Sequence, residues 1–574
     1  MRRPGSPVND PAVRTARELQ GSSLQSWMAE WIGGTGLRRL LEQLNRRWTS
    51  PRTASLLIAL GYLLLVGMAL ARHEMWRDEI EAWLLARDSG SLRELFQNLR
   101  NEGHPGLWYV LLMPLTRLSR SPEWMQALHL VIAVSAVYVV TRFSPFTRLQ
   151  SLLFPLGFYM GWQYSVVSRD YAPGVLLLVT FCALYPRRHK LFPIVGLVLM
   201  LAAHTHLLVL ILTIAIGIGM VVDMGILFAQ KPNAFDRKRV WGIITGFGFI
   251  VIGVMTSLAQ LIPDANYVGP ADSAARFLRE NTSVIGQVAL VGVIALSLLL
   301  YRVRKHLSLV LLSSLGLVGV VAYSESSILG AIAGAPGFKV FAFIGLIAYL
   351  LLLWQLRDRP SLLILYGLGI SGLLLFFLGI HSGGPHHHGL LFVMYFIAYC
   401  LERLTRAENL PASPHVPRSI TADAFFTFIL VCQAVFGIKA LHQDLMTPYS
   451  NGKYVAQYIQ AQGWQETPMV GCMDYSGQTV VGYLGIDKMY YPQGERWGSF
   501  IVWDQERYEN VGFDNCLVSA QALAQKLGRD VMVVSSYATE SSPHESQFQK
   551  VAEFRGAIRE DENFVLYRSK AFAD

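Results

Sequence analysis

The sequence has few charged residues and few cysteines for its length. Of its 574 residues, 16% are Asp, Glu, Lys or Arg and 52% are hydrophobic, whereas a typical soluble domain carries about 25% charged residues. This composition argues against a soluble cytosolic enzyme and against a disordered chain. Five cysteines are too few for a disulfide-rich scaffold, and no CxxC pair occurs among them.

Motifs of soluble nucleotide and hydrolase chemistry are also absent. The sequence has no Walker loop, no GxSxG and no GxGxxG beside a strand, and the glycines of 246–253 lie inside a long apolar run. The histidines match neither HExxH nor a zinc-finger spacing. A cytoplasmic nucleotide site therefore has no visible basis in the sequence.

What the sequence has is a succession of apolar runs. They predict a polytopic α-helical membrane protein with about 13 transmembrane helices, although several runs are shorter than the ~20 residues that a spanning helix needs. The runs are 53–71, 125–141, 150–167, 172–186, 191–203, 207–228, 240–262, 283–300, 307–322, 338–356, 361–380, 389–402 and 422–440.

The distribution of Arg and Lys predicts the orientation of these helices. Basic residues gather in alternate loops, for example at 187–190 and 237–239, and cytoplasmic loops are the ones enriched in Arg and Lys. This places the N-terminus in the cytoplasm and, after an odd number of crossings, the C-terminus outside. The long loop 72–124 is Arg-rich and outside, but long loops obey the rule weakly. The expected location is the bacterial inner or plasma membrane, and the net charge of +9 then reflects the loops, with no nucleic-acid partner.

The chain divides into three predicted parts. Residues 1–52 form a cytoplasmic segment, read either as carrying a helix on the membrane surface at 24–48 or as a poorly ordered tail. Residues 53–440 form the transmembrane domain with its first outer loop, and 441–574 form a small extracytoplasmic α/β domain. In that domain we expect strands at 468–474, 488–492, 530–536 and 563–568, and helices at 479–485 and 517–528.

With this topology, the unusual polar residues collect on the outer side of the membrane. Ionisable groups near membrane depth are costly and often mark a functional site. Asp78 is either a general base or a solvated helix start, and Arg169 is either a phosphate clamp or the local partner of Asp170. Adjacent histidines on a helix point in different directions, so 386–388 cannot chelate a metal as a unit. The residues concerned are Asp78, Glu79, His104, Arg169, Asp170, Tyr171, His204, His206, His386, His387 and His388.

The order of these motifs resembles that of GT-C glycosyltransferases, close to the protein O-mannosyltransferase-like group that includes lipid A aminoarabinose transferases. The resemblance covers roughly residues 50–400. An acidic pair follows the first helix (Asp78-Glu79), an HPP-like segment begins at His104, an SRE-like segment begins at Ser168, a THY-like segment spans 204–206, and a basic outer motif occupies 386–388. This chain departs from the pattern in having Gly106 for the second proline, a shortened second motif, and a late loop rich in His instead of Arg.

The resemblance implies an integral-membrane glycosyltransferase that takes a sugar from a polyprenyl-phosphate donor. The acceptor is a lipid, a glycan or a protein at the extracytoplasmic face, and the reaction is an inverting single displacement. Asp78 would deprotonate the acceptor, and Glu79 would orient the acceptor or support Asp78. Binding of the donor phosphate and the substrate would fall to His104, Arg169, Asp170, Tyr171, His204, His206, His386, His387 and His388.

The cofactor stays open at this point. Some members of the superfamily bind a divalent metal through such acids, which makes Asp78, Glu79 and Asp170 the candidate ligands here. Two other functions also stay open: a multi-helix transporter, and a non-catalytic membrane assembly protein with an outer α/β domain. A transporter would place its charges near the midplane between paired repeats, whereas these charges gather at one rim and no repeat is evident.

Two of the five cysteines fall in the predicted outer domain. Cys472 lies in an expected strand and Cys516 at the start of an expected helix, in the only part of the chain exposed to an oxidising compartment. A disulfide between them would close a loop of about 43 residues and contribute about 3–4 kcal/mol by the chain-entropy model. The alternative is a pair of buried free thiols.

Overall fold

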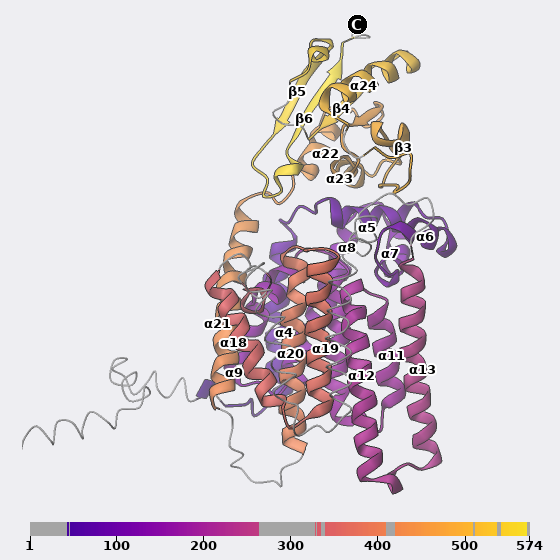
Figure 1. Cartoon of the computed structure of the whole chain (residues 1–574). Helices are drawn as coiled ribbons and strands as arrows, with labels where there is room; N and C mark the ends of the chain where they lie inside the picture. The colour runs from indigo at the N-terminus through magenta and orange to yellow at the C-terminus, as the bar shows by residue number, and fades with distance from the viewer. Residues whose placement is uncertain are drawn as a thin grey trace, which may run out of the picture.

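The structure, a computed structural model, describes residues 43–44, 46–262, 328, 330–334, 339–408, 420–508, 511–536 and 541–570. They form a helical bundle with a small α/β domain at one end (Figure 1). Most of the expected surface helix at 24–48 and the runs expected at 283–300 and 307–322 lie outside the described residues.

Among the described residues, six helices are long and apolar enough to cross a membrane. By length and composition they fit an integral membrane protein, but they do not confirm the expected 13 crossings. The six are α4 (Pro51–Leu70), α8 (Glu123–Phe143), α12 (Leu207–Gln230), α13 (Arg237–Gln260), α19 (Pro360–Gly379) and α21 (Ile420–Met446). Other apolar helices are α7 (Leu107–Leu118), α10 (Tyr171–Leu184), α11 (Phe192–Ala203), α18 (Lys339–Leu356) and α20 (Pro385–Glu408).

The run 150–167 is not the single spanning helix that the sequence predicts. It begins as α9 (Arg148–Leu153) and continues as a 3₁₀ turn (Phe154–Leu156) and a π-helical turn (Phe158–Gln163). Pro155 lacks an N–H and destabilises a regular α-helix at this point, and Gly157 has an extended backbone between the two turns. The break delivers the chain into the 164–170 loop, which leads directly to α10.

A layer of short helices separates the bundle from the α/β domain. It consists of α5 (Arg77–Asp88), α6 (Leu92–Asn98) and α7, which lie between the two parts (Figure 1). Ile80, Leu84 and Leu112 of this layer are buried in one hydrophobic core with Val480 and Val481 of the α/β domain. The domain is therefore packed onto the outer loop helices through a shared apolar core.

The α/β domain contains a six-stranded sheet of order β3-β2-β1-β4-β6-β5. The central strand β1 is parallel to β2 and β4, and the remaining pairs are antiparallel. Every expected strand and helix of this domain is present. The elements are α22 (Gly452–Ala461), β1 (Met469–Gly471), α23 (Asp474–Leu484), β2 (Met489–Tyr491), β3 (Arg496–Gly498), α24 (Phe513–Leu527), β4 (Met532–Ser535), β5 (Phe548–Phe554) and β6 (Phe564–Ser569).

The two strands that the sequence did not predict, β3 and β5, are the edges of the sheet. Edge strands keep one side in solvent and so carry polar residues. β3 has only three residues, none of them buried, and β5 contains Gln549, Lys550 and Glu553. Their sequences therefore lack the apolar runs by which the inner strands were recognised.

A disulfide joins Cys472, which follows β1, to Cys516 in the first turn of α24. The two Cα atoms are 5.3 Å apart, and both side chains are fully buried in the core between the sheet and α24. The bond encloses α23, β2, β3 and the segment that leads to α24.

Non-reducing peptide mapping should recover Cys472 and Cys516 in one linked peptide pair. Reduction should lower the stability of the α/β domain by about 3–4 kcal/mol, because the open chain regains the entropy of the closed loop. Cys400 is fully buried in the bundle with its thiol free, so it serves as the internal control and should alkylate after denaturation without reductant. Full alkylation of Cys472 and Cys516 under the same conditions would disprove the bond.

Candidate active site

Four segments that are distant in the sequence bring polar residues to the end of the bundle that faces the α/β domain. Asp78 lies in the first turn of α5, Arg169 and Asp170 directly precede α10, and His206 directly precedes α12. His386 lies in the first turn of α20. Each of these residues stands at a helix start, and the bundle gathers those starts together.

Asp78 and Arg169 form an ion pair. The Asp78 side chain is 27% exposed and Arg169 13% exposed, so the pair lies at the wall of the site and remains accessible. Burial tends to raise the pKa of Asp78, but Arg169 and Arg77 outweigh burial and hold that pKa below its usual range. Asp78 is therefore ionised near neutral pH. The local pair between Arg169 and Asp170 that the sequence left open is not formed; no hydrogen bond reaches either Asp170 oxygen.

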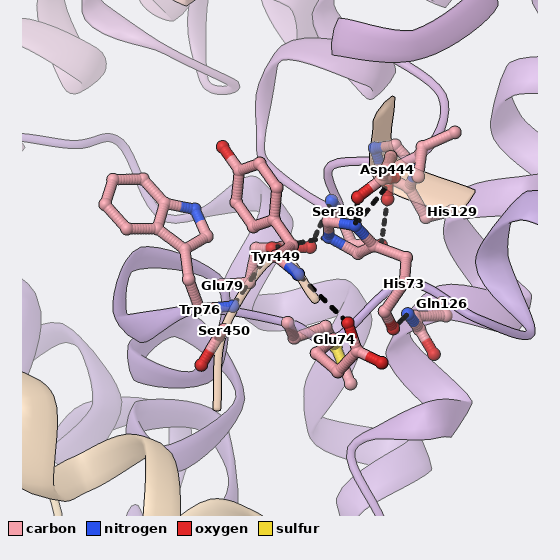
Figure 2. A network of polar contacts seen from close by, with 12 residues as sticks. His73, Glu74, Trp76, Glu79, Gln126, His129, Ser168, Asp444, Tyr449 and Ser450 are labelled. Carbon is pink, nitrogen blue, oxygen red and sulfur yellow. Dashed lines mark hydrogen bonds and ion pairs between the residues drawn. The ribbon is translucent and has the colours of Figure 1, made fainter. Parts of the chain in front are cut away.

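A buried network centred on His73 includes Glu79, the residue that follows Asp78 (Figure 2). The Nδ1 atom of His73 is 3.0 Å from both carboxylate oxygens of Asp444, and its Nε2 atom is 3.1 Å from Oε2 of Glu79. All three side chains are buried. With a carboxylate on each ring nitrogen, both nitrogens act as donors, which requires the imidazolium form.

Glu79 is fully buried in this network. Its Oε1 atom accepts a hydrogen bond of 2.6 Å from the backbone N–H of Ser168, the residue that precedes Arg169. Its Oε2 atom also accepts from the N–H of Trp76 at 3.3 Å. Glu79 thus ties the start of α5 to the 164–170 loop, and its lone pairs are used for that purpose. These contacts fit the support of Asp78 that the sequence offered as one role of Glu79, and its catalytic and metal-ligand roles stay predictions.

A second group of side chains lies next to Asp78 and consists of His104, Asp170 and His206. The His104 Nδ1 atom is 3.4 Å from Oδ2 of Asp170, and the rings of His104 and His206 are 4.9 Å apart between centroids. Burial lowers the pKa of His104 and raises the pKa of Asp170. The predicted metal candidates are therefore separated: Asp170 stands with two histidines, Asp78 with arginines, and Glu79 with His73.

The histidine run of α20 splits in the way its helical spacing requires. His386 and His387 approach the site, with ring centroids 5.9 and 6.1 Å from that of Tyr171. His388 points elsewhere, where its Nε2 atom lies 2.7 Å from the carbonyl oxygen of Ser382 and its ring packs on Phe377. These contacts position His388 within the fold, and its predicted substrate role stays a prediction.

Tyr171 and His204 also have different surroundings. The Tyr171 ring is buried and lies 4.3 Å from that of His206, at the floor of the site. His204 instead contacts α13, with its Nε2 atom 2.9 Å from the hydroxyl of Thr256 and its Nδ1 atom 3.3 Å from Gln260. His204 thus contacts α13, and its substrate-binding role stays a prediction.

The α/β domain adds groups to the rim of the site through the segment 559–562. The guanidinium of Arg559 lies 3.6 Å from the centroid of the Trp76 ring, two residues before Asp78. Asp561 pairs with Arg77 at 2.6 Å, and the buried Glu562 accepts a hydrogen bond of 2.7 Å from the backbone N–H of Arg77. Burial raises the pKa of Glu562 to about 8. The start of α5 is therefore fixed by contacts with the α/β domain and by the hydrogen bonds of Glu79.

The chain is similar in structure to ArnT from Cupriavidus metallidurans, which was solved bound to undecaprenyl phosphate. The match covers 90% of this chain and 98% of that chain, with 13% sequence identity and a TM-score of 0.44. The sequence matches no family model and no curated protein. The roles of individual residues are therefore argued from this chain's own contacts.

Three residues of the site escaped the sequence analysis: His73, Asp444 and Arg559. His73 and Asp444 are 371 positions apart, and each looks like an ordinary polar residue at the end of an apolar run. A histidine directly after the first span was a usable signal for a buried charge. Arg559 sits in the α/β domain, where a surface arginine is unremarkable, and only the docking of that domain reveals it.

Proposed function

We propose that this chain is an integral-membrane glycosyltransferase that transfers a sugar from a polyprenyl-phosphate donor to an acceptor at the extracytoplasmic face. The observation that carries this proposal is the accessible Asp78–Arg169 pair at the start of α5, a helix that lies between the bundle and the α/β domain (Figure 1). Asp78 is the base for the acceptor, and Arg169 is the ligand for the donor phosphate. The motif resemblance supports the same reaction.

Arg169 suits the phosphate because a planar guanidinium donates two parallel hydrogen bonds to phosphate oxygens. When the donor binds, its phosphate competes with Asp78 for Arg169. Loss of that partner removes the main influence that holds the pKa of Asp78 low. Donor binding thus frees the Asp78 carboxylate and makes it a stronger base at the moment when the acceptor needs one.

The transfer is a single displacement. Asp78 takes the proton from the acceptor hydroxyl or amine, whose heavy atom forms a bond to the anomeric carbon as the bond from that carbon to the phosphate oxygen breaks. The electron pair leaves with polyprenyl phosphate, which gains one negative charge. Arg169, together with Arg559 at the rim, stabilises this developing charge. Attack and departure on opposite faces of the sugar invert the anomeric configuration.

A groove beside His104 offers a path for the lipid. It has a volume of about 340 Å³, and its lining combines apolar side chains with Arg100 and His104, which suits a hydrocarbon chain that ends in a phosphate. The lining residues are Phe96, Leu99, Arg100, His104, Ala259 and Gln260.

The proposal requires the α/β domain to lie outside the cytoplasm. A reporter that is active only in the cytoplasm, fused after Asp574, should therefore give no signal. The same reporter inserted after Arg188, in a basic loop, should give a strong signal because positive loops stay in the cytoplasm. The reverse pattern would place the whole site on the wrong side of the membrane.

Replacing Arg169 with Ala should weaken the binding of polyprenyl phosphate by about tenfold or more, since hydrogen bonds to charged groups contribute about 1.5–3 kcal/mol. Arg169→Lys should fall between, because lysine keeps the charge but loses the planar fork. Binding is measured with the purified protein in nanodiscs. Wild-type affinity in Arg169→Ala would leave this arginine with only the structural task of pairing with Asp78.

A further inference from the structure

Three side chains of the site converge from three separate segments. His104 precedes α7, Asp170 precedes α10, and His206 precedes α12. Each offers one ligand atom, and these atoms all lie within 4.8 Å of one another. In the part of the chain that the structure describes, this is the group with the geometry to hold a metal ion.

The facing atoms of this group lack hydrogen-bond partners. Neither carboxylate oxygen of Asp170 has a hydrogen bond, and the same holds for Nε2 of His206 and for Nδ1 of His104, whose 3.4 Å distance to Oδ2 of Asp170 is an ion-pair contact. Asp170 is only 4% exposed and His206 only 2%. Burying a polar atom without a hydrogen bond costs free energy of desolvation, and such atoms are rare in native structures. A single cation between the three side chains would satisfy them all.

We propose that His104, Asp170 and His206 bind one divalent transition-metal ion, with Zn²⁺ the best match. Two imidazoles and one carboxylate form a ligand set that zinc prefers, whereas Mg²⁺ and Ca²⁺ prefer oxygen ligands alone. Three protein ligands leave a fourth position for a water or a substrate oxygen. The ligands of a tetrahedral zinc lie about 3.4 Å from one another, so binding draws the three side chains closer together.

The Nδ1 atom of His206 already has a partner. It accepts a hydrogen bond of 3.0 Å from the backbone N–H of Leu208 at the start of α12. If Nε2 binds the metal, the imidazole proton must sit on Nδ1, and the Leu208 bond is lost. Metal binding therefore replaces the Leu208 hydrogen bond of His206 with a bond to the metal. We expect a strong chelator to remove the ion from such a site.

The ion would sit one residue from Arg169 and close to the Asp78 pair. There it would add positive charge for the phosphate or hold an acceptor oxygen. That part in transfer rests on the proposed function, whereas binding of the ion does not. The two can therefore fail separately.

The test uses the full chain, purified through an affinity tag that contains no histidine and stripped with a chelator. After loading with Zn²⁺ and desalting, we expect one metal ion per chain by elemental analysis. Loading with Co²⁺ should give the visible absorption of a tetrahedral site. Asp170→Asn should weaken binding at least tenfold, since even outer partners of a metal site contribute that much. His104→Ala should do the same and serves as the second variant, because His104 is partly exposed.

The matched control is His204→Ala. His204 is two residues from His206 but contacts Thr256 and Gln260, so its loss should leave the metal content unchanged. The proposal is overturned if the loaded wild-type chain holds far less than one ion, or if Asp170→Asn retains the ion as tightly as the wild type. Sugar transfer at the full rate by a metal-free chain would overturn the part of the ion in transfer and leave the proposed function intact. One bound ion without transfer would support the metal site and contradict the proposed function.

Discussion

Replacing Asp78 with Asn should reduce the rate of sugar transfer by about 10²–10⁴-fold, the usual cost of losing a general base. Asparagine keeps the shape of the side chain but cannot accept the proton of the acceptor. Binding of the donor lipid should persist or tighten, because Arg169 no longer has Asp78 as a competing partner. Rate and binding are measured on the same purified variant, so the two effects can be separated.

The control for this substitution is Asp88→Asn at the other end of α5. Asp88 pairs with Arg87 at 2.7 Å and accepts a hydrogen bond of 2.5 Å from the hydroxyl of Ser499, away from the site. The Asp88→Asn substitution removes one charge from the same helix, and the variant should transfer sugar at a rate near that of the wild type. Near wild-type turnover in Asp78→Asn would show that this carboxylate is not the base.

Removing the charge at His73 should cause the largest loss of stability among the substitutions considered. His73→Gln leaves the carboxylates of Glu79 and Asp444 buried without the cation between them, and breaking a buried ion pair typically costs about 3–5 kcal/mol. The rate of transfer should fall as well, because Glu79 anchors the loop that carries Arg169. Thermal unfolding in detergent, with and without substrate lipid, measures both effects.

The double variant His73→Gln/Asp444→Asn supplies the control. It removes one of the two stranded carboxylates, so it should be more stable than His73→Gln alone, and the cycle yields the coupling energy. A His73→Gln protein that unfolds at the wild-type temperature would show that His73 carries no charge in the fold.

The pH dependence of stability follows from the same network. Burial alone would lower the pKa of His73, but Asp444 and Glu79 outweigh burial and raise it well above its usual value. The stabilisation is therefore fully present below the unfolded pKa of about 6.5 and is lost as pH rises through the raised folded pKa. His73→Gln should lose this alkaline decline.

The sequence predicted the grouping of Asp78 with Arg169 because both follow apolar runs on the same side, and topology alone brings such ends together. It could not predict that Glu79, the direct neighbour of Asp78, is buried against His73 and the backbone N–H of Ser168. Successive residues of a helix lie about 100° apart, and the partner that captures Glu79 is selected by packing. The inner strands were readable from their apolar runs, whereas Pro155 broke a run that composition alone made look continuous.

The most direct measurement is turnover of a panel of polyprenyl-phosphate sugars by the purified protein with candidate acceptors. The account predicts that one donor is consumed, that free polyprenyl phosphate appears in equal amount to the glycosylated product, and that the product has the inverted anomeric configuration. The wild type should do this and Asp78→Asn should not. A product with retained configuration, or transfer at equal rates by both proteins, would contradict the account.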